Sequence, residues 1–335
     1  MRLGPTKTAR LMFGLTVSLV ITAVVVGALV LVAGESEPRV GSTGTVALAA
    51  APATKTPEAT RTVSIAPISP HGAPLDAYRG LASWVDVYDT GAWRNPAAAV
   101  RDMSRHGVRT LFVQTAHFNS RSAIVNPKDL REFIVEGHAH GMRVVAWYLP
   151  DMRVGSVDYD RVIAAVNFRT ADGQAFDSFA MDIESDVIHS QALRNHGLKV
   201  LSKKVRAYVG PSYPLGAIIP APAALRKDTS VWKHFPYEMV AKYYDVFVPM
   251  AYYTYHGNGA QAAYDDARAN LRVLRSSPGC ENMPVHMIGG IAQSSSTAEV
   301  KAFVRAVQGD CLGASIYGWP GTREGAWRAL SAIKP

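Results

Sequence analysis

From residue 78 onward, the sequence repeats one unit: a short apolar run, a turn, and an amphipathic stretch. Near-continuous apolar runs are typical of parallel strands, which are buried on both faces. The stretches between them begin with Asn, Ser or Pro and end on Gly, which start and cap helices. The eight expected strands span residues 81–89, 108–118, 142–150, 176–185, 215–223, 246–255, 283–292 and 312–321.

Eight strand–helix units in roughly 260 residues match the count and size of a (β/α)₈ (TIM) barrel. An open, doubly wound α/β sheet of eight strands is the alternative. Such a sheet usually has a Gly-rich phosphate turn after its first strand, and YDTGAWRN (88–95) is not one. The sequence therefore predicts an α/β protein with a closed TIM barrel.

The N-terminal part has a different composition. Residues 1–10 carry three positive charges, and residues 11–34 form an apolar run without a charged side chain. This run is long enough to span a bilayer, and the charge distribution keeps the N-terminus in the cytoplasm. We expect a transmembrane signal-anchor over residues 1–34. The alternative is a long cleaved signal, with Ala-Leu-Ala at 47–49 as its cleavage site.

Residues 35–75 are rich in Ala, Thr, Pro, Ser and Gly, a composition typical of a flexible linker. The predicted domains are therefore an anchor (1–34), a linker (35–75) and a barrel (76–335). We expect the barrel on the outer side of the cell membrane, or secreted if the anchor is cleaved. Because Cys280 and Cys311 each precede a predicted neighbouring strand, we also expect them to form a disulfide, with two free buried cysteines as the alternative.

Polar and aromatic residues gather where the predicted strands end, which is where TIM barrels hold their active sites. Aromatic rings stack on sugar rings, and carboxylates and amides pair with hydroxyl groups, so this mixture indicates a sugar-binding site. The strand-end residues are Trp84, Asp86, Tyr88, Asp89, Gln114, His117, Trp147, Tyr148, Asp151, Asp182, Glu184, Met250, Tyr252, Tyr253, Tyr255, Gln293, Tyr317 and Trp319.

The stretch FDSFAMDIES (176–185) places Ala180, Asp182 and Glu184 on one face of the fourth strand, by its period of two. If that face points into the barrel, both acids converge at its mouth. Two neighbouring carboxyl groups do not both ionise freely, so one is held protonated near neutral pH. A protonated carboxyl group beside a glycosidic oxygen is a general acid. Binding of an Arg or capping of the next helix is the alternative role for this pair.

These residues resemble a known family. The stretch Asp177-x-x-Ala180-x-Asp182-x-Glu184 is similar to the Asp-x-x-Asp-x-Asp-x-Glu signature of family-eighteen glycoside hydrolases, the chitinase-like TIM barrels. The resemblance extends to Met250-Ala251-Tyr252 on the sixth strand and to Trp319 on the eighth. It covers the barrel in outline and these three short motifs in detail.

The resemblance implies a role for each matching residue. Glu184 would be the acid/base, and Asp182 would orient the substrate's N-acetyl group, whose carbonyl oxygen is the nucleophile. Tyr252 would hydrogen-bond the same group, and Trp319 would form the floor beneath the sugar. We expect a substrate-binding set of Tyr252, Trp319, Met250, Asp86, Trp84, Gln114, Trp147 and Asp151.

Ala180 departs from this family, which has its middle Asp there, so Asp182 lacks the carboxylate with which it would share a proton. A weaker resemblance links the Asp-x-Glu pair and an early Val-Asp-Val run (85–87) to family-twenty-five lysozymes, which cut peptidoglycan. In that resemblance Asp86 joins Asp182 and Glu184 around the scissile bond. Both families act on polymers of N-acetylhexosamine.

Other chemistry has little support. The ten His residues form no His-x-His or His-Glu-x-x-His motif, and no Gly-x-Ser-x-Gly elbow is present, so we expect no metal, no cofactor and no serine hydrolase. The net charge of +8 includes no basic run interleaved with aromatics, which argues against nucleic-acid binding. We expect a monomer.

The sequence thus predicts an exported glycoside hydrolase that cleaves an N-acetylhexosamine-containing polysaccharide of the cell-wall or chitin type. A TIM barrel that binds glycans without cleaving them is the main alternative, because of Ala180. A barrel hydrolase of another sugar or of a phosphodiester is the third hypothesis.

Overall fold

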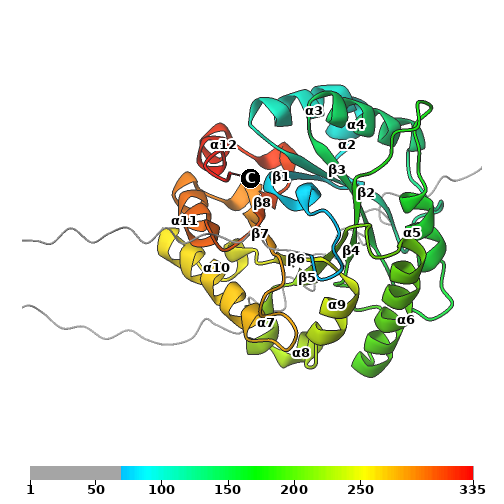
Figure 1. The fold of residues 1–335 in the computed structure, drawn as a ribbon. Helices are drawn as coiled ribbons and strands as arrows, with labels where there is room; N and C mark the ends of the chain where they lie inside the picture. Colours follow the sequence, from blue (N-terminus) through cyan, green and yellow to red (C-terminus); the bar gives the residue numbers. More distant parts are fainter. Residues whose placement is uncertain (1–68, 335) are drawn as a thin grey trace, which may run out of the picture. The chain divides into compact units, whose positions relative to one another are not determined.

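The computed structural model describes residues 69–334, which fold into a closed barrel of eight parallel strands surrounded by helices (Figure 1). Each strand pairs with the next in the chain, and β8 pairs with β1 through Gly80–Gly313 and Leu81–Ala314. This closure confirms the predicted TIM barrel and excludes the open sheet. The strands are β1 (Gly80–Val85), β2 (Thr110–His117), β3 (Arg143–Leu149), β4 (Ser178–Asp182), β5 (Leu215–Pro220), β6 (Val246–Met250), β7 (His286–Ile291) and β8 (Gly313–Tyr317).

The helices lie outside the strands and follow the predicted start signals. Asn95 accepts a hydrogen bond from the Ala98 N–H at the start of α3, and Ser296 and Glu299 form a reciprocal capping box on α11. The α-helices are α2 (Thr90–Arg94), α3 (Pro96–Arg105), α4 (Pro127–Ala139), α5 (Asp158–Val166), α6 (Gln191–Val209), α7 (Pro222–Lys227), α8 (Thr229–Trp232), α9 (Tyr237–Tyr243), α10 (Ala260–Arg275), α11 (Thr297–Val307) and α12 (Glu324–Leu330). Short 3₁₀ helices are η1 (Asp76–Tyr78), η2 (Tyr253–Tyr255), η3 (Ala292–Ser294) and η4 (Trp319–Gly321).

Alternate residues of each strand face two separate apolar layers. The outer layer lies between the strands and the helices, and the inner layer fills the barrel. We call the inner layer the interior cluster; it consists of Leu75, Ala77, Tyr78, Ala82, Trp84, Phe112, Val145, Trp147, Ala180, Ile218, Val246, Val248, Met250, Ile288 and Leu312. Trp84 and Phe112 stack at its centre, with ring centroids 4.1 Å apart. The barrel is therefore a packed core, and chemistry is confined to its ends.

The segment before β1 closes the N-terminal end of the barrel. Tyr78 is fully buried inside, and its hydroxyl lies 2.7 Å from the Ser178 hydroxyl. A Cβ on Gly216 would lie 2.5 Å from the Tyr78 hydroxyl, so this close approach requires glycine. The Tyr78 carbonyl also accepts a hydrogen bond from His286 Nδ1.

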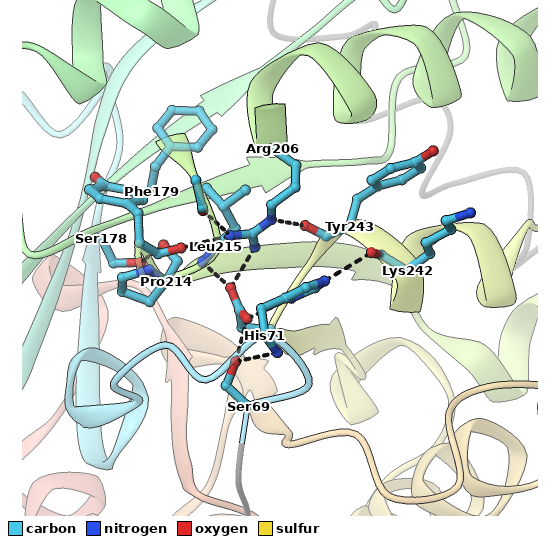
Figure 2. Close-up of polar contacts among 12 residues, drawn as sticks. Ser69, His71, Ser178, Phe179, Arg206, Pro214, Leu215, Lys242 and Tyr243 are labelled. Atoms are coloured by element: carbon cyan, nitrogen blue, oxygen red, sulfur yellow. Dashed lines mark hydrogen bonds and ion pairs between the residues drawn. The ribbon is translucent and has the colours of Figure 1, made fainter. Parts of the chain in front are cut away.

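Residues 69–75, which we expected in the linker, pack on the barrel. The buried Asp245 carboxylate accepts hydrogen bonds from the Ser69 hydroxyl, from His71 Nδ1 (2.9 Å) and from Arg206 Nη2 (2.6 Å). Figure 2 shows Ser69, His71 and Arg206 converging on this point. Arg206 compensates the buried charge, and the two N-terminal side chains fasten the segment to the start of β6.

The expected anchor (1–34) and most of the expected linker lie outside the described residues. Between residues 69 and 334, no helix combines the length and apolar character needed to cross a membrane. Export of the barrel therefore remains a prediction from the sequence.

The predicted disulfide is not formed, because the structure has Cys280 and Cys311 as free thiols. Arg275 links the two loops instead: its guanidinium donates to the carbonyls of Cys280 and Asp310. Burial raises the pKa of both thiols to about 12, so each is held in its neutral form.

Candidate active site

Asp182 and Glu184 stand at the C-terminal end of β4 in different environments. β4 ends at Asp182, three residues earlier than expected, and the backbone pairs once more through the Ile183 N–H and the Ile218 carbonyl. Asp182 is 5% exposed, and its Oδ1 has no hydrogen-bond partner among the described residues. Glu184 lies two residues further on and its side chain is open to solvent. The pair therefore joins one buried acid to one accessible acid at the barrel mouth.

Both carboxyl groups hold protons more tightly than usual. Burial, and then the negative charge of Glu184, raises the pKa of Asp182 well above its ordinary range. Desolvation by the surrounding protein, and then the negative charge of Asp186, raises the pKa of Glu184 to about 7. Burial therefore favours the protonated form of Asp182, while Glu184 exchanges its proton with solvent near neutral pH, which is the behaviour needed for acid/base chemistry.

Tyr252 lies near the same two acids, two strands away from β4 around the barrel. β6 ends at Met250, and Tyr252 follows with a left-handed backbone (φ +40°), which is unfavourable for a tyrosine. This turn directs its ring against the interior cluster, whereas the next residue, Tyr253, packs in the outer layer. Burial, and then the nearby Glu184 and Asp182, raises the pKa of Tyr252 well above 10, so its hydroxyl remains a hydrogen-bond donor.

Asp86 and Tyr317 complete the mouth where the first and last strands meet. The Tyr317 hydroxyl donates to Asp86 Oδ2 at 2.7 Å, and the Tyr88 N–H donates to Asp86 Oδ1 at 2.6 Å. The Tyr317 ring packs against the interior cluster, 6.1 Å from the Tyr252 ring. Sequence reasoning placed Tyr317 at a strand end without giving it a role, although it ends β8 as Asp182 ends β4.

Four residues predicted to bind substrate lie beneath the mouth as barrel core. Trp84 and Met250 are 2% and 7% exposed, and Trp84 Nε1 donates to the Ser315 hydroxyl. Gln114 is buried and accepts a hydrogen bond from the Val87 N–H, which holds the loop after β1. Trp147 is also buried. These side chains support the site from below and do not form its surface.

Ala180 leaves the buried layer beneath the mouth without a carboxylate at this position. It is fully buried and lies opposite Trp147 on β3 and Gly216 on β5. The indole N–H of Trp147 is buried and has no partner among the described residues, like Asp182 Oδ1. A carboxylate at position 180 would have introduced an acceptor here, so its absence leaves Asp182 without the neighbour that the family signature supplies.

Two other predicted residues make structural contacts in the loops that follow their strands. The Trp319 indole N–H donates to Asp102 on α3 at 2.9 Å, and its ring packs against the outer layer. The chain leaves the strand direction after Tyr317 and enters η4, which turns Trp319 outward. Asp151 accepts a hydrogen bond from the Arg153 N–H and stabilises the loop after β3. Tyr317 occupies the inward position on β8, and the floor role of Trp319 stays a prediction that its outward position does not favour.

An exposed aromatic extends the site beyond Asp86. Tyr88 is 64% exposed, and one face of its ring stacks on His117 at 6.3 Å between centroids. Burial, and then Arg161, lowers the pKa of His117, so its ring is neutral near pH 7. Because Tyr88 is also tied to Asp86 through its N–H, it offers a fixed ring face beside the mouth.

In the part of the chain that the structure describes, no group of three His, Cys, Asp or Glu side chains is placed to hold a metal ion.

Comparison with known proteins supports the fold. No model of a known protein family matches the chain, and no curated protein matches it. Among solved structures, it is similar to an endo-β-1,4-mannanase from Thermotoga petrophila, with a TM-score of 0.57 and 9% identity over 76% of each chain. It is similar to a family-eighteen chitinase from Cycas revoluta, with a TM-score of 0.51 and 12% identity over 76% of this chain and 99% of the other.

The spore cortex-lytic enzyme SleL from Bacillus cereus is a further neighbour, with a TM-score of 0.52 and 10% identity over 75% of this chain and 73% of the other. At these identities the likeness concerns the fold. It confirms the TIM-barrel fold, which the chain shares with these glycosidases and chitinases.

Proposed function

We propose that this protein is an exported glycoside hydrolase that cleaves a polysaccharide containing N-acetylhexosamine, with Glu184 as its general acid and base. One observation carries the proposal: Glu184 is open to solvent and has a pKa of about 7, beside a buried Asp182 whose pKa is also raised. A purely structural pair would be satisfied by Arg, Lys or helix N–H partners, and neither side chain has one among the described residues.

In the proposed reaction, Glu184 donates its proton to the glycosidic oxygen as the bond from that oxygen to the anomeric carbon breaks. The substrate's acetamido carbonyl oxygen attacks that carbon from the other side. Asp182, held protonated, accepts the acetamido N–H through its carbonyl oxygen, and the Tyr252 hydroxyl donates to the acetamido oxygen. Water then attacks the anomeric carbon, the bond from that carbon to the acetamido oxygen breaks, and ionised Glu184 takes the proton that the water loses.

Two of the structural neighbours favour this substrate class. The Cycas revoluta chitinase was solved in complex with (GlcNAc)₃, and SleL is described as a spore cortex-lytic enzyme. A barrel held outside the membrane by the apolar N-terminal run would meet wall polysaccharide directly. We therefore propose peptidoglycan or a chitin-like polymer as the substrate.

The decisive experiment compares Glu184→Gln with the wild type on purified peptidoglycan and chitin oligomers. Loss of a general acid lowers turnover by about 10²–10⁴-fold, while glycan binding and the unfolding temperature should be nearly unchanged. Glu281→Gln is the matched control, because Glu281 is exposed at the other end of the barrel. Equal turnover by Glu184→Gln and wild type would remove Glu184 from the mechanism.

A second function remains favoured by Ala180: a barrel that binds glycans without cleaving them. It predicts that the wild type binds oligosaccharide and releases no product. Ala180→Asp supplies the carboxylate of the family signature. If it introduces turnover, the wild type is inactive only because that carboxylate is absent; if it does not, other catalytic groups are absent as well.

A further inference from the structure

The N-terminal end of the barrel, opposite the mouth, holds a cavity of about 500 Å³. It lies under β1 to β4, outside the interior cluster. Its charged lining residues are Arg79, Arg109, Arg143, His138, Asp76 and Asp177.

The strand register brings the three arginines together. Arg79 immediately precedes β1, Arg109 immediately precedes β2, and Arg143 begins β3. The Arg109 N–H donates to the Leu81 carbonyl and the Arg143 N–H donates to the Arg109 carbonyl, so these positions are direct neighbours at the sheet edge. Arg79 lies two residues before Leu81, and all three arginines line the same cavity, so one ligand there can contact all of them.

The acids of the cavity do not balance this charge. Asp177 already accepts hydrogen bonds from Arg143 (2.9 Å), His138 (2.9 Å) and the Val144 N–H (2.8 Å). Asp76 approaches Arg79 only at 3.7 Å and is largely exposed. Arg109 makes no hydrogen bond or ion pair through its side chain within residues 69–334.

The hydrogen bond that His138 donates to Asp177 is the largest cause of its raised pKa, and a protonated His138 adds to the positive charge as pH falls. The cavity therefore contains three guanidinium groups. Arg143 is paired with a carboxylate, Arg79 is weakly paired, and the Arg109 side chain has no partner among the described residues. Guanidinium forks bind phosphate oxygens in pairs, and their mutual repulsion falls when an anion lies between them.

We propose that this cavity is a binding site for a phosphate group, separate from the glycan site at the other end of the barrel. The group could be part of a soluble phosphate ester or of a lipid headgroup, since residues 69–78 enter the barrel at this same end. Arg109 and Arg79 bind the phosphate oxygens directly, and Arg143 contributes from its Asp177 pair.

The test uses the full chain in detergent and measures binding of glycerol 3-phosphate by titration calorimetry at low salt. Arg109→Gln and Arg79→Gln should each weaken binding by tenfold or more. Arg101→Gln removes the same charge from an exposed position on α3 that does not line the cavity, and should bind like the wild type. No saturable binding by the wild type, or an equal loss in Arg101→Gln, would overturn the proposal.

A second arm distinguishes the source of the phosphate. Sedimentation with phosphatidylglycerol and phosphatidylcholine vesicles compares the wild type with Arg109→Gln. An Arg109-dependent preference for phosphatidylglycerol that glycerol 3-phosphate abolishes assigns the site to lipid headgroups. Equal partition of both proteins, together with Arg109-dependent calorimetry, assigns it to soluble esters. An Arg109-dependent preference that glycerol 3-phosphate leaves unchanged would contradict a discrete phosphate site.

Discussion

The Tyr317 hydroxyl donates a 2.7 Å hydrogen bond to Asp86 Oδ2, which ties the end of the last strand to the end of the first at the barrel mouth. Tyr317 also packs beside Tyr252, whose pKa responds to Glu184, Asp182 and Asp86. These residues come from β1, β4, β6 and β8, so the acids and phenols form one constellation around the mouth.

The pH dependence of hydrolysis should follow the proton on Glu184. Because the acid must be protonated and its pKa is about 7, kcat/KM should fall as pH rises through 7. The charge of Asp186 contributes to this elevation, so Asp186→Asn should move the alkaline fall to lower pH. The exposed Asp160→Asn is the control for the loss of one charge. A pH profile that Asp186→Asn leaves unchanged would argue against Glu184 as the titrating acid.

Stability should respond to Asp182 in the opposite sense from an ordinary surface acid. Its folded-state pKa is raised, so the native state binds the proton that the unfolded chain releases, and stability falls as pH rises from about 4. Asp182→Asn removes this dependence and should increase the free energy of unfolding at pH 7. The gain should vanish near pH 4 in urea titrations. A variant less stable than the wild type at both pH values would refute a neutral, buried Asp182.

Tyr252→Phe should slow turnover with little change in glycan affinity. Only the hydroxyl is lost, and a hydrogen bond made in the transition state is worth about 1–1.5 kcal/mol, or roughly tenfold in kcat. Tyr253→Phe is the matched control, because that hydroxyl donates to Ser295 in the outer layer. A loss that appears in KM alone would move Tyr252 from transition-state stabilisation to ground-state binding.

Substitution of Trp319 should affect mainly stability, whereas substitution of Tyr317 should affect mainly glycan binding. Trp319→Ala should lower the free energy of unfolding by about 2–4 kcal/mol, since it removes packing and the hydrogen bond to Asp102, and should leave glycan affinity nearly unchanged. Tyr317→Ala should weaken glycan binding, because its ring lies at the mouth. Thermal unfolding and glycan titration on both variants check this, and the reverse pattern would restore Trp319 as the sugar floor.

Tyr88→Ala should weaken binding of long oligosaccharides more than short ones. The ring is exposed and stacked on His117, so it offers a face to a sugar distant from Glu184. Loss of one stacking contact is worth about 1 kcal/mol, or roughly fivefold in Kd. Titration of the inactive Glu184→Gln background with short and long oligomers measures it. An equal effect on all lengths would place Tyr88 at the central subsite instead.

The barrel was predictable because its signals are local. Apolar runs, helix-start residues and terminal glycines recur within each unit, and eight such units leave few alternatives to closure. Asp182 and Glu184 were predictable for the same reason, since two acids after a buried run stand at the functional end of a barrel strand.

The tertiary structure decided which strand-end side chains face the mouth and how deep they lie. Tyr317 and Trp319 are two residues apart and would share a face if β8 continued, but the chain turns after Tyr317 and sends Trp319 to α3. Trp84 looked like a surface aromatic, whereas its position along the barrel axis buries it on Phe112.

Pairing between distant segments likewise lay beyond the sequence pattern. Arg79, Arg109 and Arg143 are each an unremarkable residue at a strand start, and only the register of three strands gathers them around one cavity. Arg275 joins the loops of Cys280 and Cys311 where spacing suggested a disulfide. Local sequence patterns determined the fold class and the two acids at the end of β4. Strand register, strand length and depth along the barrel axis depend on contacts between distant residues, and these decided which side chains line the site.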